Sequence, residues 1–222
     1  MSDGDRAFAP LPLLLYGDTD CPVCGLGAAF VQPKHYDVCR RCGWGDDPDA
    51  YARPDEQSET NETSLNEAIA RWPRVLAESL STAPLSAFEI AVRDDEIGGY
   101  DYIVDGKPVR ELYGTGTLRA SIGPWPAPGD WSANLVSGGR SETPTGRTRL
   151  YVCHLCGGDD YEPALTAAVR VGDERVIWSR IGLEEYEYSS EGWQVNLRNG
   201  PAGFAFDARD YRAAFSRVSP RA

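Results

Sequence analysis

The chain has 222 residues, enough for one large domain or two small ones. Hydrophobic residues make up 41% of it and charged residues 25%, which is typical of a globular protein and excludes disordered or collagen-like chains. Acidic residues outnumber basic ones by 34 to 22, so the formal net charge is −12. Such a chain lacks the attraction to phosphate that drives binding to nucleic acid or anionic membranes, and a basic protein is the more natural partner.

The amino-terminal segment carries no targeting signal that we recognise. No stretch approaches the roughly 20 apolar residues that a membrane span needs, and the longest apolar segment, 8–16, contains prolines. Asp3 and Asp5 outnumber Arg6 at the start, and no small-residue cleavage site follows Leu15, so we expect no secretory signal. We therefore predict a cytoplasmic protein, in which cysteines serve as metal ligands or thiols more often than as disulfides.

The first chemical signal along the chain is a pair of C-x-x-C-G units, Cys21/Cys24 and Cys39/Cys42, with fourteen residues between Cys24 and Cys39. Two residues between thiolates allow one tight turn to direct both sulfurs at a single ion, and the following glycine permits that turn. The segments 30–31 and 36–38 are expected to form the strands of a hairpin between the turns. This pattern predicts a zinc ribbon with a closed, structural four-cysteine site that leaves no position for a catalytic water.

Other interpretations of the four cysteines remain open. They could form two disulfides or stay unliganded, and an iron-based electron-transfer centre uses the same paired turns, because a tetrahedron of sulfurs does not by itself separate zinc from iron. Trp44 and Trp72 are expected to pack a small core beneath the metal. The acidic residues that follow, beginning with Asp46 and Asp47, are interpreted as a solvated loop that offers an acidic face to a basic partner.

A helix is predicted after the acidic loop. Ser64 and Glu67 have the spacing of a capping box, and an apolar stripe then continues to Trp72. Pro73 either ends this helix, at 65–72, or begins a second short one. The segment 81–86 has the composition of a linker, so we predict two domains, 1–81 and 85–222.

The second half is predicted to be an antiparallel β-rich domain, either a single sheet or a small sandwich, closed by a carboxy-terminal helix. Asp105-Gly106 is a typical hairpin turn, and Asp207 is a candidate cap for the helix. The whole chain is therefore assigned to the α+β class. The expected strands are 88–92, 100–104, 135–136, 149–152, 164–171 and 175–178.

The third pair, Cys153 and Cys156, follows an expected strand and is a candidate second metal half-site. Two further ligands would have to come from His154, His35, the acids at 159–160 or another chain. The pair could instead be structural thiols or a redox dithiol, although a thioredoxin-like motif should lie between a strand and a helix.

Several of these segments together resemble the bacterial cysteine-rich CPCC domain. Val23 stands where that family typically has its middle cysteine, which suggests that the outer two cysteines are the ligands. The resemblance covers about residues 20–75 and implies metal binding without a defined activity, and the remainder resembles uncharacterised bacterial proteins. The segments that carry the resemblance are Cys-Pro-Val-Cys-Gly at 21–25, Tyr-Asp-Val-Cys-Arg-Arg-Cys-Gly-Trp-Gly-Asp-Asp-Pro at 36–48, Asn61, and Ser-Leu-Asn-Glu-Ala at 64–68.

These patterns favour a zinc-stabilised, acidic protein-binding protein, for example an immunity-type protein that neutralises a basic toxin. The alternative is an enzyme, either a metal- or dithiol-based electron carrier or a hydrolase that uses acids of the β-rich half. His35 and His154 are the only histidines, and the chain has no nucleophile elbow, phosphate loop or dinucleotide fingerprint, so we expect no enzyme. No nucleic-acid partner is expected, and the oligomeric state is left open.

Overall fold

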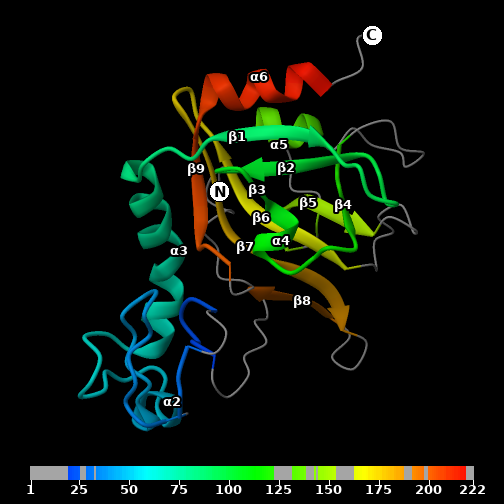
Figure 1. The fold of residues 1–222 in the computed structure, drawn as a ribbon. Helices are drawn as coiled ribbons and strands as arrows, with labels where there is room; N and C mark the ends of the chain where they lie inside the picture. Colours follow the sequence, from blue (N-terminus) through cyan, green and yellow to red (C-terminus); the bar gives the residue numbers. More distant parts are fainter. Residues whose placement is uncertain are drawn as a thin grey trace.

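The computed structural model is an α+β protein in which a cysteine-containing module is followed by antiparallel sheets and a carboxy-terminal helix (Figure 1), as the sequence predicts. None of the described helices is long and apolar enough to cross a membrane. The residues that the structure describes are 20–25, 29–32, 34–122, 132–138, 143, 145–153, 163–187, 192–197 and 200–218.

The described part of the module consists of turns and the helices α2 and α3, and the expected hairpin between the cysteine pairs is wrong. The described residues 29–32 and 34–38 contain no strand, and only an isolated bridge joins Val38 to Gly45. The Asp37 carboxylate takes the place of a strand ladder, because its Oδ2 accepts hydrogen bonds from the N–H groups of Val31 (2.9 Å) and Gln32 (3.3 Å). A side chain thus satisfies backbone donors that a hairpin would have paired.

Helix α3 (Leu65–Thr82) is one continuous helix, which corrects both alternatives considered at Pro73. Ser64 caps it as predicted, since its Oγ accepts a hydrogen bond from the Glu67 N–H at 3.2 Å. A proline inside a helix costs about 3 kcal/mol, but burying a leucine side chain stabilises by roughly 1.5–3 kcal/mol. Leu76 and Leu80, both beyond the proline, are buried. Their packing offsets the cost and keeps the helix intact.

The described strands of the second half form two antiparallel sheets. The smaller has the order β1-β2-β3, formed by Phe88–Val92, Tyr100–Val104 and Lys107–Pro108. Asp105 and Gly106 join β2 to β3 with φ values of 51° and 76°, as the predicted turn requires. The larger has the order β4-β5-β6-β7-β8, formed by Leu118–Ala120, Thr148–Cys153, Ala164–Val171, Arg175–Glu187 and Gly192–Leu197, and β9 (Gly203–Asp207) pairs with β7.

Strand β7 continues far beyond the expected end at Trp178 and changes partner along its length. Its first part pairs with β9 and its second part, from Gly182, pairs with β8. The change occurs at Arg180, whose φ is 51°, and the pairing with β6 shifts register between Thr166 and Ala168. This irregularity is a β-bulge, and it allows β7 to pair first with β9 and then with β8 along the same edge.

The described residues of the second half also form three helices, and one of them corrects a prediction. Leu135 and Val136 were expected in a strand but lie in α5 (Ser132–Ser137), because two adjacent apolar residues do not distinguish the two structures. Helix α4 (Val109–Leu112) follows β3. Helix α6 (Ala208–Val218) is capped as predicted, with Asp207 Oδ1 accepting from the N–H groups of Arg209 (2.9 Å) and Asp210 (3.0 Å).

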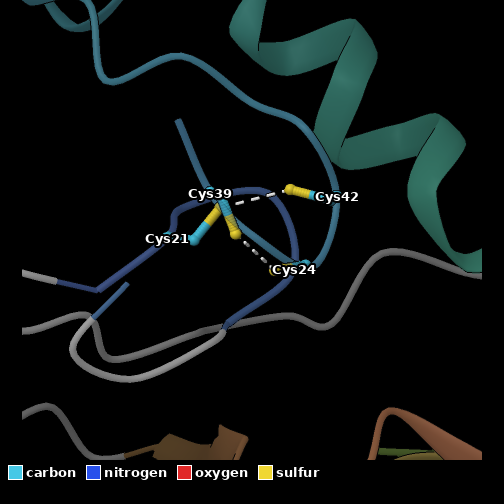
Figure 2. A group of neighbouring side chains, drawn as sticks. All are labelled: Cys21, Cys24, Cys39 and Cys42. Atoms are coloured by element: carbon cyan, nitrogen blue, oxygen red, sulfur yellow. Dashed lines mark hydrogen bonds between the residues drawn. The ribbon is translucent and has the colours of Figure 1, made fainter. Parts of the chain in front are cut away.

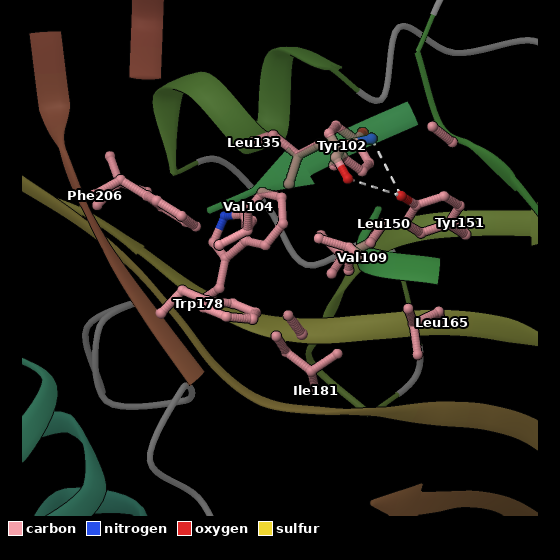
Figure 3. Close-up of a cluster of buried hydrophobic side chains, with 14 of the residues drawn as sticks. Tyr102, Val104, Val109, Leu135, Leu150, Tyr151, Leu165, Trp178, Ile181 and Phe206 are labelled. Atoms are coloured by element: carbon pink, nitrogen blue, oxygen red, sulfur yellow. Dashed lines mark hydrogen bonds between the residues drawn. The ribbon is translucent and has the colours of Figure 1, made fainter. Parts of the chain in front are cut away.

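The main core lies between the smaller sheet, α6 and one face of the larger sheet. Figure 3 shows the part of it around Trp178 and Tyr102. Trp178 is fully buried there, with its ring 5.4 Å from that of Tyr102 and 5.2 Å from that of Phe206. Its Nε1–H donates to the Tyr211 hydroxyl at 3.1 Å, so the polar atom is satisfied. Tightly packed aromatic rings of this kind contribute large buried areas to stability.

Helix α3 packs on the opposite face of the larger sheet and connects the module to it (Figure 1). Leu76 and Leu80 contact Ile177 of β7 and Ala205 of β9. Ile177 and Trp178 are neighbours in β7, so their side chains point to opposite faces of the sheet, one toward α3 and one toward the main core. The predicted boundary between residues 81 and 85 therefore falls at the end of a helix that already contacts the second half.

Candidate metal centre

The four cysteines of the two predicted pairs come together in the module (Figure 2). Their sulfur atoms all lie within 4.8 Å of one another, with 3.5 Å between Cys21 and Cys42 and 3.6 Å between Cys24 and Cys39. A disulfide bond is about 2.05 Å long, so neither distance is that of a disulfide. Sulfurs bound to one zinc ion at about 2.3 Å lie about 3.8 Å apart at the corners of a tetrahedron. The four thiols could therefore hold one metal ion.

Two similar turns position the sulfurs. In the first, the Gly25 N–H donates to the Cys21 carbonyl at 2.8 Å, and in the second the Gly43 N–H donates to the Cys39 carbonyl at 2.9 Å. Both glycines adopt left-handed conformations, with φ values of 68° and 77°. Glycine enters this region without steric cost, which explains why it follows the second cysteine of each pair.

Burial and mutual contact shape the electrostatics of the cluster. Cys21, Cys24 and Cys39 are buried, whereas Cys42 is only half-buried. The pKa of Cys21 is raised by its hydrogen bonds with the other thiols, that with Cys24 first, and by burial. The pKa of Cys39 is lowered, because hydrogen bonds from Cys21 and then Cys24 stabilise its thiolate. Four thiolates in one buried site repel one another, so complete ionisation requires a bound cation and releases protons.

Asn61 holds the chain that leaves the second turn, a role that the sequence alone did not reveal. Its Oδ1 accepts from the Gly45 N–H at 2.9 Å and its Nδ2 donates to the Gly45 carbonyl at 3.0 Å. A Cβ atom at Gly45 would lie 2.5 Å from Thr60 Cγ2, so a larger residue here would require the Thr60 side chain to shift. A buried side chain that pairs both backbone groups of one residue fixes the chain as a strand partner would.

Asp46 and Asp47 are not part of a solvated loop, and this prediction is wrong. They are only 1% and 2% exposed. Asp46 accepts hydrogen bonds from the Tyr51 hydroxyl (2.6 Å) and from the Lys34 N–H, and burial followed by the contact with Asp46 raises the pKa of Tyr51. Buried carboxylates need such donors to remain favourable. The acidic run in the sequence concealed these two specific contacts.

Asp47 caps helix α2 (Pro48–Ala52), which begins with a proline at its first position. Its Oδ1 accepts from the Asp49 N–H at 2.9 Å. Burial alone would raise the pKa of Asp47, but hydrogen bonds, first from the Asp49 N–H and then from Thr60 and Ser58, lower it overall. The carboxylate is therefore a structural cap beside the metal centre and faces the protein interior.

The two tryptophans pack as predicted. Trp44 is 5% exposed and lies in the cluster of buried side chains around the cysteines, and Trp72 packs against both that cluster and the contact between α3 and the larger sheet. The Nε1–H of Trp44 is buried, and it has no hydrogen-bond partner among the residues that the structure describes.

The structure describes only one residue of the third cysteine pair. Cys153 is the last residue of β5 and is half-buried, and Cys156 lies outside the described residues, as do His154 and the acids at 159–160. Within the described ranges, the first four cysteines form the only group of three or more histidine, cysteine or acidic residues placed to hold a metal. The second half-site stays a prediction.

Paired turns, converging thiols and a buried surround define a cysteine-rich metal-binding module. Residues 19–79 match the protein family described as Cysteine-rich CPCC, which agrees with the resemblance inferred from the sequence. The match ends within α3 and leaves the larger part of the chain unassigned. Neither the curated proteins nor the solved structures contain a significant match to this chain.

Proposed function

We propose that the four cysteines bind one zinc ion that stabilises the module and that the protein serves as a binding scaffold. The observation that carries the proposal is the convergence of four sulfurs within 4.8 Å in a largely buried site. A metal held by four protein ligands supplies folding energy and offers no open position to a water nucleophile. Cys21, Cys24, Cys39 and Cys42 would hold the ion, and we assign no reaction to it.

The charge of the chain supports a basic protein as the partner. Residues 1–81 hold 14 acids against 7 Lys and Arg, and residues 85–222 hold 20 against 15, so both halves are acidic. Attraction between opposite charges speeds association, and repulsion disfavours partners of like charge. An immunity-type protein that neutralises a cationic toxin is one such scaffold. A reducing compartment such as the cytoplasm would keep the four thiols available to the metal.

Iron is the second candidate, because the same sulfur geometry suits an iron centre that carries electrons. The two metals are separated by the visible spectrum of the purified protein. An iron–thiolate centre absorbs visible light and a zinc centre does not. A coloured protein with stoichiometric iron would replace the scaffold proposal with electron transfer.

Elemental analysis with a count of metal per chain tests the metal assignment. We expect one zinc ion per chain, lost when any of the four cysteines is replaced. Two ions per chain that fall to one in Cys153→Ser would assign the third pair to a second site. Absence of stoichiometric metal from protein purified without chelators would contradict the proposal.

Co-expression with the product of a neighbouring gene, followed by a pull-down at low salt, tests the basic partner. We expect a basic protein to be retained and then released as the salt concentration rises, because salt screens attraction between exposed charges. Failure to retain any basic protein would argue strongly against the scaffold proposal.

A further inference from the structure

A groove of about 420 Å³ lies beside the candidate metal centre. One wall is the second cysteine turn, with Cys42 and Trp44, and the other is a face of α3, with Ala68, Trp72 and Val75. Cys42, the least buried of the four cysteines, lies on the side of the cluster next to α3 (Figure 2). Volumes of this size are typical of sites that bind small molecules or individual side chains.

The helix wall follows directly from helical periodicity. Ala68, Trp72 and Val75 are spaced at i, i+4 and i+7, so they lie on one face of α3. Val75 is 36% exposed and Trp72 is half-buried, which leaves apolar surface open to the groove. The opposite wall depends on the Cys39–Cys42 turn, which a bound metal would hold in place. The shape of the groove is thus tied to the metal centre.

The segment 54–70, which supplies five of the residues that line the groove, is acidic. Glu62 is one of these lining residues, and the segment contains no lysine, arginine or histidine. Arg71 is the single basic residue of the lining. The segment carries five carboxylates, all exposed: Asp55, Glu56, Glu59, Glu62 and Glu67.

Aromatic walls beside carboxylates suit a cationic occupant. Indole faces attract lysine and arginine side chains, and their contact area also favours an apolar anchor. Trp44 and Arg71 also line the groove. A peptide main chain carries carbonyl acceptors for the Arg71 guanidinium.

We propose that this groove binds a peptide segment of the basic partner, with an apolar side chain against Trp72 and Val75 and flanking lysine or arginine side chains near Glu62. The inference rests on the proposed function, because it assigns the surface that the basic partner would use. It also gives the metal a second consequence, since the ion would hold one wall of the recognition surface.

Three seven-residue peptides test the occupant, with the metal-loaded full-length protein followed by NMR. The first has a central leucine flanked by lysines and arginines, the second replaces that leucine with serine, and the third keeps the leucine between acids. We expect saturable binding of the first peptide only, weakened by salt, with shifts concentrated at residues 60–63, 68, 71, 72 and 75. Binding of the acidic peptide, or no binding of the basic one at millimolar concentration, overturns the inference.

Two matched pairs of exposed substitutions locate the site. We expect Val75→Arg and Glu62→Lys each to weaken binding of the basic peptide about tenfold, because they add bulk or positive charge to the groove. Val92→Arg in β1 and Glu78→Lys elsewhere on α3 make the same chemical changes outside it, and should leave affinity within about twofold. Equal effects within each pair would show that the peptide binds elsewhere.

The metal and the full partner separate this inference from the proposed function. Removing the metal should abolish peptide binding and returning zinc should restore it, whereas unchanged binding would contradict the metal-dependent wall. If a basic partner is retained equally by wild-type protein, Val75→Arg and Glu62→Lys, the groove assignment fails while the proposed function stands. If no basic protein or peptide binds, both fail.

Discussion

The two regions of the molecule are stabilised by different means. The buried cluster around the candidate metal centre contains eight described residues, of which three are cysteines. The main core of the second half contains twenty, with Trp178, Tyr211 and Phe206 in mutual ring contact. Small cores rarely stabilise a fold without a metal or disulfide. We therefore expect the module to depend on a bound metal and the β-rich half on apolar packing.

Loss of one ligand should produce the largest effect and should be confined to the module. Binding of a structural zinc ion contributes roughly 10–16 kcal/mol, so Cys24→Ser should release the metal and unfold residues 20–72. The main core lacks these ligands and should remain folded. Metal content, together with hydrogen exchange resolved along the chain, measures both outcomes.

Val38→Ala is the control for this substitution, because Val38 is adjacent to Cys39 and is 62% exposed. It should change the free energy of unfolding by less than about 0.5 kcal/mol. Equal loss of exchange protection in both halves of Cys24→Ser would show that the two regions form one cooperative unit.

Truncation in the main core should have the converse effect. Trp178→Ala removes the ring contacts with Tyr102 and Phe206 and should lower the free energy of unfolding of the second half by about 3–5 kcal/mol. Metal content should stay at the wild-type level, since Trp178 faces away from α3. Chemical denaturation with metal analysis checks this, and Val92→Ala, at a 76% exposed position, is the control. Loss of metal from Trp178→Ala would mean that the module needs the second half to fold.

The contact between the regions can be measured at two equivalent glycines. Gly25 and Gly43 have φ values of 68° and 77°, so alanine at either pays a similar backbone cost of about 1–2 kcal/mol. A Cβ at Gly25 would also lie 2.6 Å from Leu197 Cδ1 of β8, whereas a Cβ at Gly43 meets nothing within 4 Å. Gly25→Ala should therefore destabilise by about 1–3 kcal/mol more than Gly43→Ala.

Combining Gly25→Ala with Leu197→Ala shows whether the difference between the glycines comes from this junction. The double variant should recover part of the stability lost in Gly25→Ala. Thermal denaturation of the wild type, the two single variants and the double variant gives the coupling energy. Additive losses would show that Leu197 does not transmit the strain.

Local chemistry in the sequence predicted local features of the structure well. The spacing of two cysteines and a glycine specifies a tight turn, so the four thiols could be grouped before any coordinates were known. The Ser64–Glu67 cap and the Asp105-Gly106 turn are equally local, and both are present. The two cysteine turns, the helix cap and the hairpin turn depend on contacts within four residues, which the order of amino acids determines directly.

Features that depend on distant contacts were missed. The helix continues through Pro73 because Leu76 and Leu80 pack on strands more than ninety residues later in the chain. Asp46 and Asp47 were missed although two of their donors lie nearby in the chain, the Tyr51 hydroxyl and the Asp49 N–H at the start of α2. The same acidic residues would also fit a solvated loop, since composition does not reveal which carboxylates accept hydrogen bonds in the fold.

The smallest predicted effect is a change in stability at acid pH, whose cause differs between the two regions. The pKa of Asp207 is lowered, first by the hydrogen bond from the Asp210 N–H and then by that from Arg209. A carboxylate whose pKa is lower in the folded than in the unfolded state stabilises the fold above the unfolded value of about 3.9, and this contribution is lost as the pH falls through the folded pKa.

Asp207→Asn keeps a capping oxygen but cannot titrate, so its stability deficit at neutral pH should disappear in acid. Asp173→Asn, which removes the same charge from an exposed turn, should show no such convergence. Urea unfolding of the second half across this pH range measures the difference, whereas acid would act on the module by returning protons to thiolates that hold a bound metal. A deficit that stays constant down to the lowest pH would show that Asp207 stabilises α6 through geometry alone and not through its charge.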